Sequence, residues 1–317
     1  MQLAKPFIKW VGGKGQLLSQ LASILPPKFE EQDMVTYIEP FIGGGAMLFY
    51  MLQKYSNIKN VVINDINPDL ITCYKVVRDD VDSLINVLSG IERNYISLSD
   101  EKRKEFFYGI RREYNSKNLS AIELAAVFIF LNRTCFNGLY RVNSKGEFNV
   151  PFGKYDNPTI CDESTLLSDS AMLQGVEIIC GDFENSLKYA NGYTLFYLDP
   201  PYRPISNTSA FTAYSKEAFN DMSQIRLKNF CDAISDAGFK FMLSNSDDKT
   251  EDKNGFFDEL YSQYQIERVW ASRSINSNPD KRGKLSEIVV HNYSLRCNLP
   301  SVTFKPSIFG QLVSSPM

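Results

Sequence analysis

An alternation of short apolar, β-branched segments with helical patterns most constrains the fold of this chain. Seven segments have the length and composition of strands: residues 35–39, 60–64, 176–180, 194–198, 239–243, 265–270 and 287–293. Helical periodicity lies between most of them, as in residues 44–55, 68–78 and 216–237. Strands that alternate with helices predict an α/β fold with a largely parallel sheet.

The alternation stops between residues 80 and 173, where two or three helices precede a segment rich in glycine and asparagine. We interpret this stretch as a mainly helical insert, ending in a hairpin, between two halves of one sheet. The predicted division is therefore a catalytic domain of residues 1–79 and 174–299, an insert of residues 80–173 and a C-terminal tail of residues 300–317. The tail has no periodicity and receives no role.

Composition excludes several classes of protein. The six cysteines are scattered without a C-x-x-C pair, and the chain has one histidine, so we expect neither a structural metal site nor a disulfide framework. The apolar run at residues 124–131 is too short to cross a bilayer, and the N-terminus lacks the pattern of a secretory signal. We therefore expect a cytoplasmic protein with no membrane segment.

Charge is distributed unevenly. The net charge is −3, but residues 102–154 contain ten Lys or Arg and four Asp or Glu, so this stretch carries +6 and the remainder −9. Residues 268–305 are also basic, with seven Lys or Arg against two Asp or Glu. Such asymmetry indicates a polyanionic partner such as DNA. A solvated helix face explains the basic cluster at residues 102–112 equally well.

A glycine-rich turn follows the first strand. The sequence Tyr-Ile-Glu-Pro-Phe-Ile-Gly-Gly-Gly spans residues 37–45 and leads into a helix, and Asp65 ends the next strand. A doubly wound sheet binds nucleotide-like ligands at such a turn, and an acidic side chain at the second strand accepts hydrogen bonds from ribose hydroxyls. Neither GxGxxG nor a phosphate-binding Gly-Lys-Ser/Thr motif is present. A nucleoside without a pyrophosphate fits better than NAD or ATP, and a tight packing turn is the structural alternative.

A second motif, Asp199-Pro200-Pro201-Tyr202, ends a buried strand. The prolines stop the strand and leave a carboxylate, a carbonyl and an aromatic ring at its carboxyl end, where ligands of open α/β sheets bind. Asp199 and the Pro200 carbonyl can accept both N–H groups of an aromatic amine, and Tyr202 can stack on its ring. An ordinary strand-ending turn is the alternative.

These motifs, in this order, resemble the Dam-type DNA adenine-N6 methyltransferases (D12 class, group alpha). The resemblance rests on residues 9–14 (KWVGGK), 40–45 (PFIGGG), 64–67 (NDIN), 181–183 (GDF), 199–202 (DPPY) and 272–276 (SRSIN), the last followed by Lys281 and Arg282. It covers about residues 5–293 and implies a Rossmann-like class I methyltransferase sheet.

The resemblance also implies S-adenosylmethionine as methyl donor. Trp10 is expected to pack on its methionyl portion, Lys14 to pair with its carboxylate, and Asp182 to accept from its amino group. The structural alternatives are a core tryptophan, a surface lysine and a helix cap. The predicted donor-binding residues are Trp10, Lys14, Glu39, Phe41, Gly43, Gly45, Asp65, Asp182, Phe183 and Asp199.

Residues 132–155 of the insert have the aromatic, amide and arginine content of a base-reading hairpin. Arg141 is expected to bind guanine O6 and N7, and Phe136 and Asn137 to occupy the space beside an extruded base. In the family that the chain resembles, tyrosine is common at the place of Phe136. The predicted DNA-binding residues are Arg133, Phe136, Asn137, Leu139, Arg141, Asn143, Pro151, Lys154, Arg273 and Asn276, with Lys145 and Arg282 as further phosphate contacts. A hairpin without base contacts is the alternative.

The resemblance implies a site-specific methyltransferase that acts on adenine N6 in duplex DNA by base flipping and direct in-line transfer. Family members with this loop pattern recognise GATC, so we predict GATC as the target. A different GAT-containing site, N4-cytosine and RNA remain alternative targets. The missing GxGxxG disfavours an NAD-dependent oxidoreductase, and the intact DPPY motif disfavours a DNA-binding protein without catalysis. We expect a monomer of bacterial or phage origin. A companion restriction endonuclease stays open.

Overall fold

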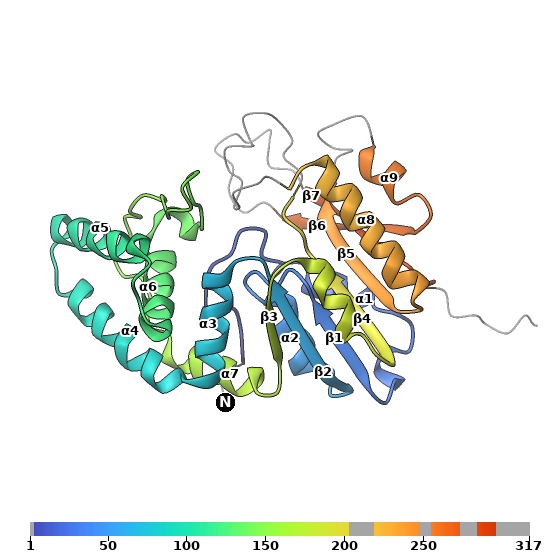
Figure 1. Cartoon of the computed structure of the whole chain (residues 1–317), viewed down its shortest axis with the longest axis horizontal. Coiled ribbons are helices and arrows are strands. Elements are labelled where there is room, and N and C mark those ends of the chain that lie inside the picture. The colour runs from blue at the N-terminus through green and yellow to red at the C-terminus, as the bar shows by residue number, and fades with distance from the viewer. Residues whose placement is uncertain (1–2, 203–218, 248–254, 273–283, 296–317) are drawn as a thin grey trace, which may run out of the picture.

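The computed structural model describes residues 3–202, 219–247, 255–272 and 284–295. A seven-stranded sheet crosses the molecule in the order β3-β2-β1-β4-β5-β7-β6 (Figure 1). Its strands are β1 (Val35–Glu39), β2 (Ile58–Asp65), β3 (Glu177–Cys180), β4 (Tyr193–Leu198), β5 (Lys240–Ser246), β6 (Gln265–Ser272) and β7 (Lys284–His291). The first five pair in parallel, whereas β7 runs antiparallel to both β5 and β6. The predicted Rossmann-like, largely parallel sheet is confirmed, with a strand at each of the seven predicted segments.

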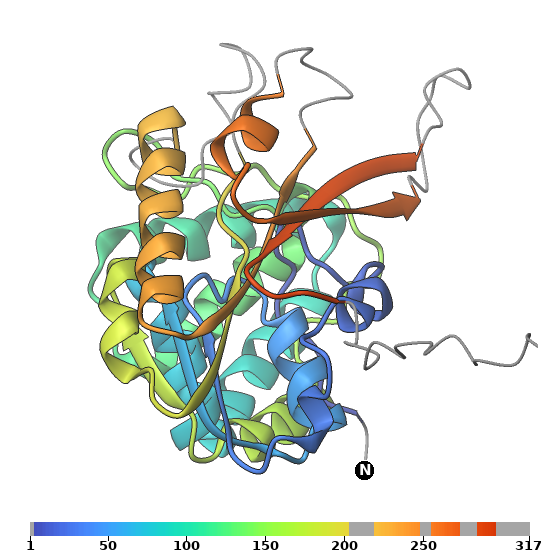
Figure 2. The ribbon, with the colours of Figure 1, turned by 90° about the vertical axis from the view of Figure 1, so that its right-hand side faces the viewer.

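Alternate side chains of each strand face opposite layers, as the period of a strand requires. In β4, Leu195 and Tyr197 join one apolar core, while Phe196 and Leu198 join the other. The first face carries α1 (Leu18–Ser23), α2 (Ala46–Lys54) and α3 (Pro68–Asp79). The second carries η3 (Phe183–Tyr189), α8 (Asp221–Asp236) and α9 (Phe256–Leu260), so the sheet is covered on both sides (Figure 2).

The strand order creates a switch point between β1 and β4. The chain leaves β1 towards β2 and later returns to β4, which lies on the other side of β1. Ile38 pairs with Phe196, so Glu39 and Leu198 end their strands side by side. Ligands of such sheets bind at the carboxyl ends next to the switch point. The glycine turn after β1 and the DPPY motif after β4 are thereby neighbours.

The region between α3 and β3 is mainly helical. It contains α4 (Val81–Ile96), α5 (Asp100–Ser116), α6 (Ala121–Thr134), η2 (Phe136–Gly138) and α7 (Glu163–Leu173), and α4 to α6 stand beyond α3 (Figure 1). A capping box of Ser120 and Glu123 begins α6, which packs on α3, α4 and α5. The domain bounds stay a prediction. Within the described residues, neither α6 nor any other helix has the length and apolarity needed to cross a membrane.

The predicted hairpin has less regular structure than a pair of continuous strands. Two isolated antiparallel bridges hold it, between Cys135 and Phe152 and between Val142 and Phe148. Side-chain hydrogen bonds supply part of the remaining order, because Asn115 accepts from the Phe148 amide and donates to the Phe148 carbonyl. The loop is therefore held both by α5 and by backbone hydrogen bonds of its own, such as that from the Asn149 amide to the Arg141 carbonyl.

Candidate active site

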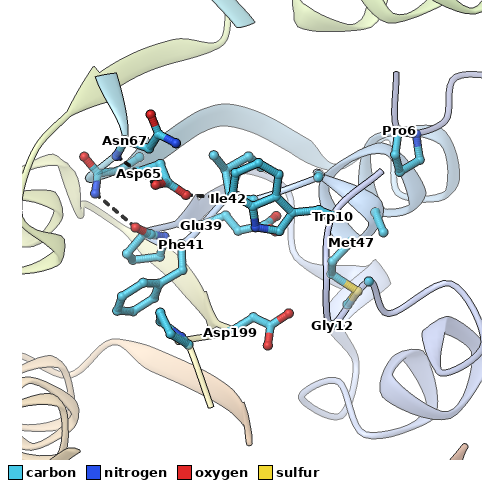
Figure 3. Close-up of a pocket in the computed structure, with 18 of the residues that line it drawn as sticks. Pro6, Trp10, Gly12, Glu39, Phe41, Ile42, Met47, Asp65, Asn67 and Asp199 are labelled. Atoms are coloured by element: carbon cyan, nitrogen blue, oxygen red, sulfur yellow. Dashed lines mark hydrogen bonds between the residues drawn. The ribbon is translucent and has the colours of Figure 1, made fainter. Parts of the chain in front are cut away.

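A cavity of about 1620 Å³ opens at the carboxyl ends of β1, β2 and β4. Figure 3 shows Trp10, Asp65 and Asp199 around it. Its walls include every predicted donor-binding residue and the whole DPPY motif: Trp10, Lys14, Glu39, Phe41, Gly43, Gly45, Asp65, Asp182, Phe183, Asp199, Pro200, Pro201 and Tyr202. Segments that are distant in the sequence thus line one space.

The glycine turn is shaped by its contact with Trp10. Gly43 has φ +46°, and a Cβ atom there would lie 2.7 Å from Cδ1 of the Trp10 indole. Gly45, with φ +75°, caps α2, and a Cβ atom there would lie 2.6 Å from the Tyr74 hydroxyl. Both positions therefore need glycine, for backbone conformation and for space. The indole lies against the turn as one wall of the cavity.

Asp65 ties the end of β2 to the glycine turn. Its Oδ2 accepts from the Gly43 amide at 3.2 Å, and its Oδ1 accepts from the Asn67 amide at 2.9 Å. Burial raises the pKa of Asp65 to about 6, against these backbone hydrogen bonds, which lower it. The carboxylate is ionised at neutral pH and keeps acceptor capacity towards the cavity.

The insert contributes an aromatic wall that sequence reasoning missed. Tyr140 stacks on Trp10 with ring centroids 5.6 Å apart, and Phe128 of α6 stacks on Tyr140 at 5.3 Å. Tyr140 also lines the cavity. Its place among the aromatic residues of the loop was visible in the sequence, but nothing there indicated that it turns towards the donor motif.

Asn132 of α6 holds the same two segments together. Its Oδ1 accepts from the Lys9 amide at 2.8 Å, and its Nδ2 donates to the carbonyls of Lys9 at 2.8 Å and Gly138 at 3.0 Å. The side chain is buried, so these bonds replace water that cannot reach it. Trp10, which follows Lys9, is thereby fixed relative to residues 132–155, the predicted base-reading segment, which we call the recognition loop.

Asp199 lies at the end of β4 next to the ammonium group of Lys14. Lys14 Nζ is 2.8 Å from Asp199 Oδ1 and donates to the Tyr202 hydroxyl at 2.6 Å. Ser244 donates to the same Asp199 oxygen at 3.4 Å. Burial raises the pKa of Asp199, and the charge of Lys14 opposes that shift. Lys14 is a buried partner of Asp199, not a surface charge, and its contact with the donor carboxylate stays a prediction.

Two further residues beside the cavity were missed. Arg226 of α8 donates to Asp182 Oδ1 at 2.6 Å and to Glu184 Oε1 at 2.7 Å, and lies over the Phe183 ring. Glu287 of β7 lies 3.4 Å from Lys14 Nζ. Neither stands in a recognisable motif, and only the packing of α8 and β7 brings them to the site.

Two predicted donor-binding residues have structural partners of their own. Asp182 caps η3 by accepting from the Glu184 amide, as the helix-cap alternative requires. Glu39 is buried and accepts from the Tyr37 hydroxyl at 2.9 Å. Burial raises the pKa of Glu39 well above its ordinary value, which favours a neutral carboxyl group at the floor of the cavity.

Comparison with known proteins identifies the family. Residues 10–275 match the family described as D12 class N6 adenine-specific DNA methyltransferase. The chain belongs to this family. It is 50% identical over 292 residues to the Type II methyltransferase M.MjaIII of Methanocaldococcus jannaschii, covering 91% of this chain and 99% of that protein. It is 30% identical over 289 residues to the DNA adenine methylase of Escherichia coli K12, covering 91% and 95% respectively.

A third relative, the DNA adenine methylase of Haemophilus influenzae, is 33% identical over 286 residues, covering 90% of this chain and 92% of that protein. The enzyme is therefore a site-specific DNA methyltransferase that modifies adenine N6, and the predicted activity is confirmed. The family implies S-adenosylmethionine as the methyl donor.

The recognition loop of the methyltransferase exposes some of its predicted DNA-binding residues. Phe136 is 52% exposed, and Asn137 is exposed with φ +57°. Pro151 is exposed, and its carbonyl accepts from the Phe136 amide at 2.9 Å. The exposed phenyl ring is therefore presented by a backbone that is itself hydrogen-bonded. Contacts between these residues and DNA stay predictions.

The other loop residues of the methyltransferase have intramolecular partners. Arg141 Nε donates to Asn149 Oδ1 at 2.7 Å, and Asn143 Oδ1 accepts from the amides of Lys145 and Glu147, which closes the turn at the loop tip. Leu139 is partly buried against the core. Arg141 is therefore oriented by Asn149, whereas the Asn143 side chain is occupied by hydrogen bonds within the turn.

Basic side chains of the methyltransferase surround a smaller cavity of about 490 Å³ near the start of the loop. Lys9, Arg133 and the exposed Lys154 line it. Arg133 Nη2 donates to the Phe7 carbonyl at 2.7 Å, and burial lowers the pKa of Arg133. Arg133 thus also holds the N-terminal segment. Arg273, Asn276, Lys281 and Arg282 lie outside the described residues.

Proposed function

We propose that this enzyme methylates adenine within GATC in duplex DNA, with S-adenosylmethionine bound in the large cavity and the target base flipped towards Asp199. One observation carries the proposal. The cavity of about 1620 Å³ is lined both by Asp65 and Trp10, which suit a nucleoside donor, and by the DPPY residues, which suit an aromatic amine. Donor and acceptor can therefore meet without an intermediate on the protein.

The chemistry of the lining fits the donor. Asp65 supplies carboxylate acceptors for ribose hydroxyls, and Trp10 supplies an apolar face. Asn64 also lines the cavity, and its Oδ1 is buried with no hydrogen-bond partner among the described residues. A buried acceptor without a partner favours a polar ligand group at this place. Phe41 and Phe183, with ring centroids 5.2 Å apart, provide an apolar surface for the adenine ring.

The residues of the DPPY motif hold and orient the target. When bound, S-adenosylmethionine supplies an electrophilic methyl group on its sulfonium sulfur. Asp199 and the Pro200 carbonyl accept the two N–H groups of adenine N6, which favours a pyramidal nitrogen with its lone pair aimed at the donor site. Tyr202 stacks on the base. Catalysis then rests on positioning and on the charge of Asp199.

The recognition loop supports the choice of target. An adenine inside a duplex cannot reach a buried carboxylate, so the base must leave the stack. Phe136, 52% exposed, is suited to fill the vacated space, and Arg141, held by Asn149, is suited to read guanine. A different GAT-containing site is the alternative. The Type II names of two relatives favour a companion restriction endonuclease that need not form a physical complex with this enzyme. We further propose that the enzyme acts as a cytoplasmic monomer.

Incubation of the purified enzyme with S-adenosylmethionine and unmodified plasmid, followed by single-molecule sequencing, tests the proposal. We expect N6-methyladenine confined to GATC. The Asp199→Ala variant is expected to give no product while remaining folded. N6-methyladenine at another sequence would overturn the GATC assignment and the roles of Arg141 and Phe136. An active Asp199→Ala variant would overturn the role of Asp199.

A further inference from the structure

Two carboxylates share one buried ammonium beneath the DPPY motif. Lys14 Nζ lies 2.8 Å from Asp199 Oδ1 and 3.4 Å from Glu287 Oε2. The side chains of Lys14 and Glu287 are 2% and 8% exposed, and that of Asp199 is 20% exposed. Such charges interact strongly because little water screens them. The arrangement therefore affects the charge of Asp199, the group that is to receive the amine.

Strand register explains how Glu287 reaches this place. Glu287 pairs with Ser246, the last residue of β5, because β7 runs antiparallel to β5. The beginning of β7 therefore lies at the same edge of the sheet as the carboxyl end of β4, where Asp199 follows. A carboxylate at the carboxyl end of β7 would lie at the opposite edge of the sheet, away from the site.

The Lys14 ammonium lies closer to Asp199 than to Glu287 in this arrangement. Glu287 Oε2 is buried and has no hydrogen-bond partner among the described residues. A buried carboxylate oxygen without a hydrogen bond is unfavourable. Glu287 therefore has unused capacity for the Lys14 ammonium, which a short movement of the lysine side chain would fill.

Methyl transfer creates a reason for that movement. The amine nitrogen gains positive charge as its bond to the methyl group forms, and Asp199 stabilises that charge best when its own charge is not neutralised. Asp199 Oδ1 already accepts from Lys14 and from Ser244. An ammonium that stays on Asp199 both competes with the amine and repels its developing charge.

We propose that Glu287 is a positioning residue for methyl transfer: it takes the Lys14 ammonium from Asp199 when the target amine arrives. The inference rests on the proposed role of Asp199 as acceptor of that amine. It adds a residue outside every motif of the sequence, and it assigns to Lys14 a movement between two carboxylates. No covalent bond changes in this step: the Lys14 ammonium exchanges one carboxylate partner for the other.

The Glu287→Gln variant tests the proposal because it keeps the shape of the side chain and removes its charge. With saturating S-adenosylmethionine and unmodified plasmid, we expect single-turnover methylation to slow by about tenfold or more. The affinity for S-adenosylhomocysteine is expected to stay within about twofold, since the ammonium remains near the cavity. The matched control is Glu267→Gln, an exposed carboxylate of β6, which is expected to behave as the wild type.

The pH profile separates positioning from support of the fold. Burial raises the pKa of Asp199, Lys14 lowers it, and the charge of Glu287 raises it. Tyr197, Tyr202 and the buried Glu39 also interact with Asp199 and are unchanged in the variant. Glu287→Gln should therefore move the acid limb of the single-turnover rate to lower pH, which a packing defect would not do. Glu287→Asp retains the charge and is expected to restore part of the rate.

A double-variant cycle covers the case in which Glu287→Gln is also less stable. If Glu287 acts through Lys14, the Glu287→Gln substitution costs little further rate in a Lys14→Gln background. Additive losses, or a Glu287→Gln enzyme with the wild-type rate and acid limb, would overturn the inference. Methylation by Asp199→Ala would instead overturn the underlying role of Asp199, so the two failures are distinguishable.

Discussion

At the scale of single residues, burial decides the ionisation of the carboxyl groups around the cavity. Burial raises the pKa of Glu39, so this group is shifted towards its neutral form. Asp199 is also shifted upwards by burial, but Lys14 opposes the shift. Asp65 keeps two backbone donors and reaches a pKa of about 6. Asp65 is thus ionised at neutral pH, whereas Glu39 is shifted towards its neutral form, which suits different tasks.

Donor binding should weaken in mild acid because of Asp65. Its pKa is raised to about 6, so the carboxylate is ionised at pH 7.5 and mostly protonated at pH 5. A protonated carboxyl group accepts ribose hydroxyls less well, so we expect the Kd for S-adenosylhomocysteine to rise about tenfold between these values. Isothermal titration calorimetry at several pH values measures this. Asp65→Asn should bind weakly at both, and an unchanged Kd in the wild type would contradict the prediction.

Gly43→Ala should damage the donor site more than the fold. The new methyl group would lie 2.7 Å from Trp10 Cδ1, at a residue with φ +46°. The indole must move, so we expect the affinity for S-adenosylhomocysteine to fall at least about tenfold, with a loss of stability of about 1–2 kcal/mol from backbone strain. Gly192→Ala, with φ +49° and open space around it, is the matched control for strain alone. Equal donor affinity in both variants would refute the steric argument.

At the scale of elements, the N-terminal segment joins the donor cavity to the recognition loop. Trp10 lies between the glycine turn and Tyr140, and Asn132 holds both Lys9 and Gly138. A short irregular segment makes this connection, held by the Asn132 amide side chain of α6 and by the stacked Tyr140 ring.

Removal of the Asn132 amide should loosen this connection. Asn132→Leu leaves the Lys9 amide and the Lys9 and Gly138 carbonyls without their partner in a buried place. We expect a loss of about 3 kcal/mol in the free energy of unfolding, at about 1 kcal/mol for each bond. Urea denaturation measures the loss. The control Asn94→Leu changes an exposed residue of α4 and should alter stability little. A change below about 1 kcal/mol in Asn132→Leu would contradict the prediction.

Sequence patterns predicted the elements well because strand and helix periods are local properties. The bounds of β1 and the positions of the glycine turn and DPPY motif follow from residues near one another in the chain. Tyr140, Arg226 and Glu287 were not predicted, because their role depends on how α8, β7 and the loop pack. Nor did the sequence indicate that Asn115 of α5 would hydrogen-bond to the loop backbone at Phe148.

At the scale of the whole molecule, an acidic chain carries a basic insert. The net charge is −3, yet residues 102–154 carry +6. Part of this charge is used internally, since Arg103 and Arg111 donate to backbone carbonyls at the surface of the insert. Exposed side chains such as those of Lys145 and Lys154 remain available to phosphates. Affinity for DNA should therefore depend on salt and on residues of the insert.

Lys154 should contribute to affinity but not to sequence choice. It is exposed beside Lys9 and Arg133. We therefore expect Lys154→Gln to make the plot of log K for DNA binding against log salt concentration less steep by about 0.9, the value of one phosphate contact. Fluorescence anisotropy across salt concentrations measures the slope, and the methylated sequence should not change. Lys59→Gln, an exposed lysine of β2, is the control. An altered target in Lys154→Gln would contradict a role limited to phosphate.

The contact of Lys14 with Glu287 has a consequence for synthesis of the enzyme. Lys14 leaves the ribosome early, Asp199 much later, and Glu287 only with β7, the central partner of β5 and β6. Long-range pairings of this kind form late, after the intervening chain is available. A nascent or truncated polypeptide that already carries the glycine turn and DPPY therefore lacks the second acceptor for the ammonium. A chain that ends before β7 also lacks the strand that joins β5 to β6, so we expect full activity only once β7 has been made and paired.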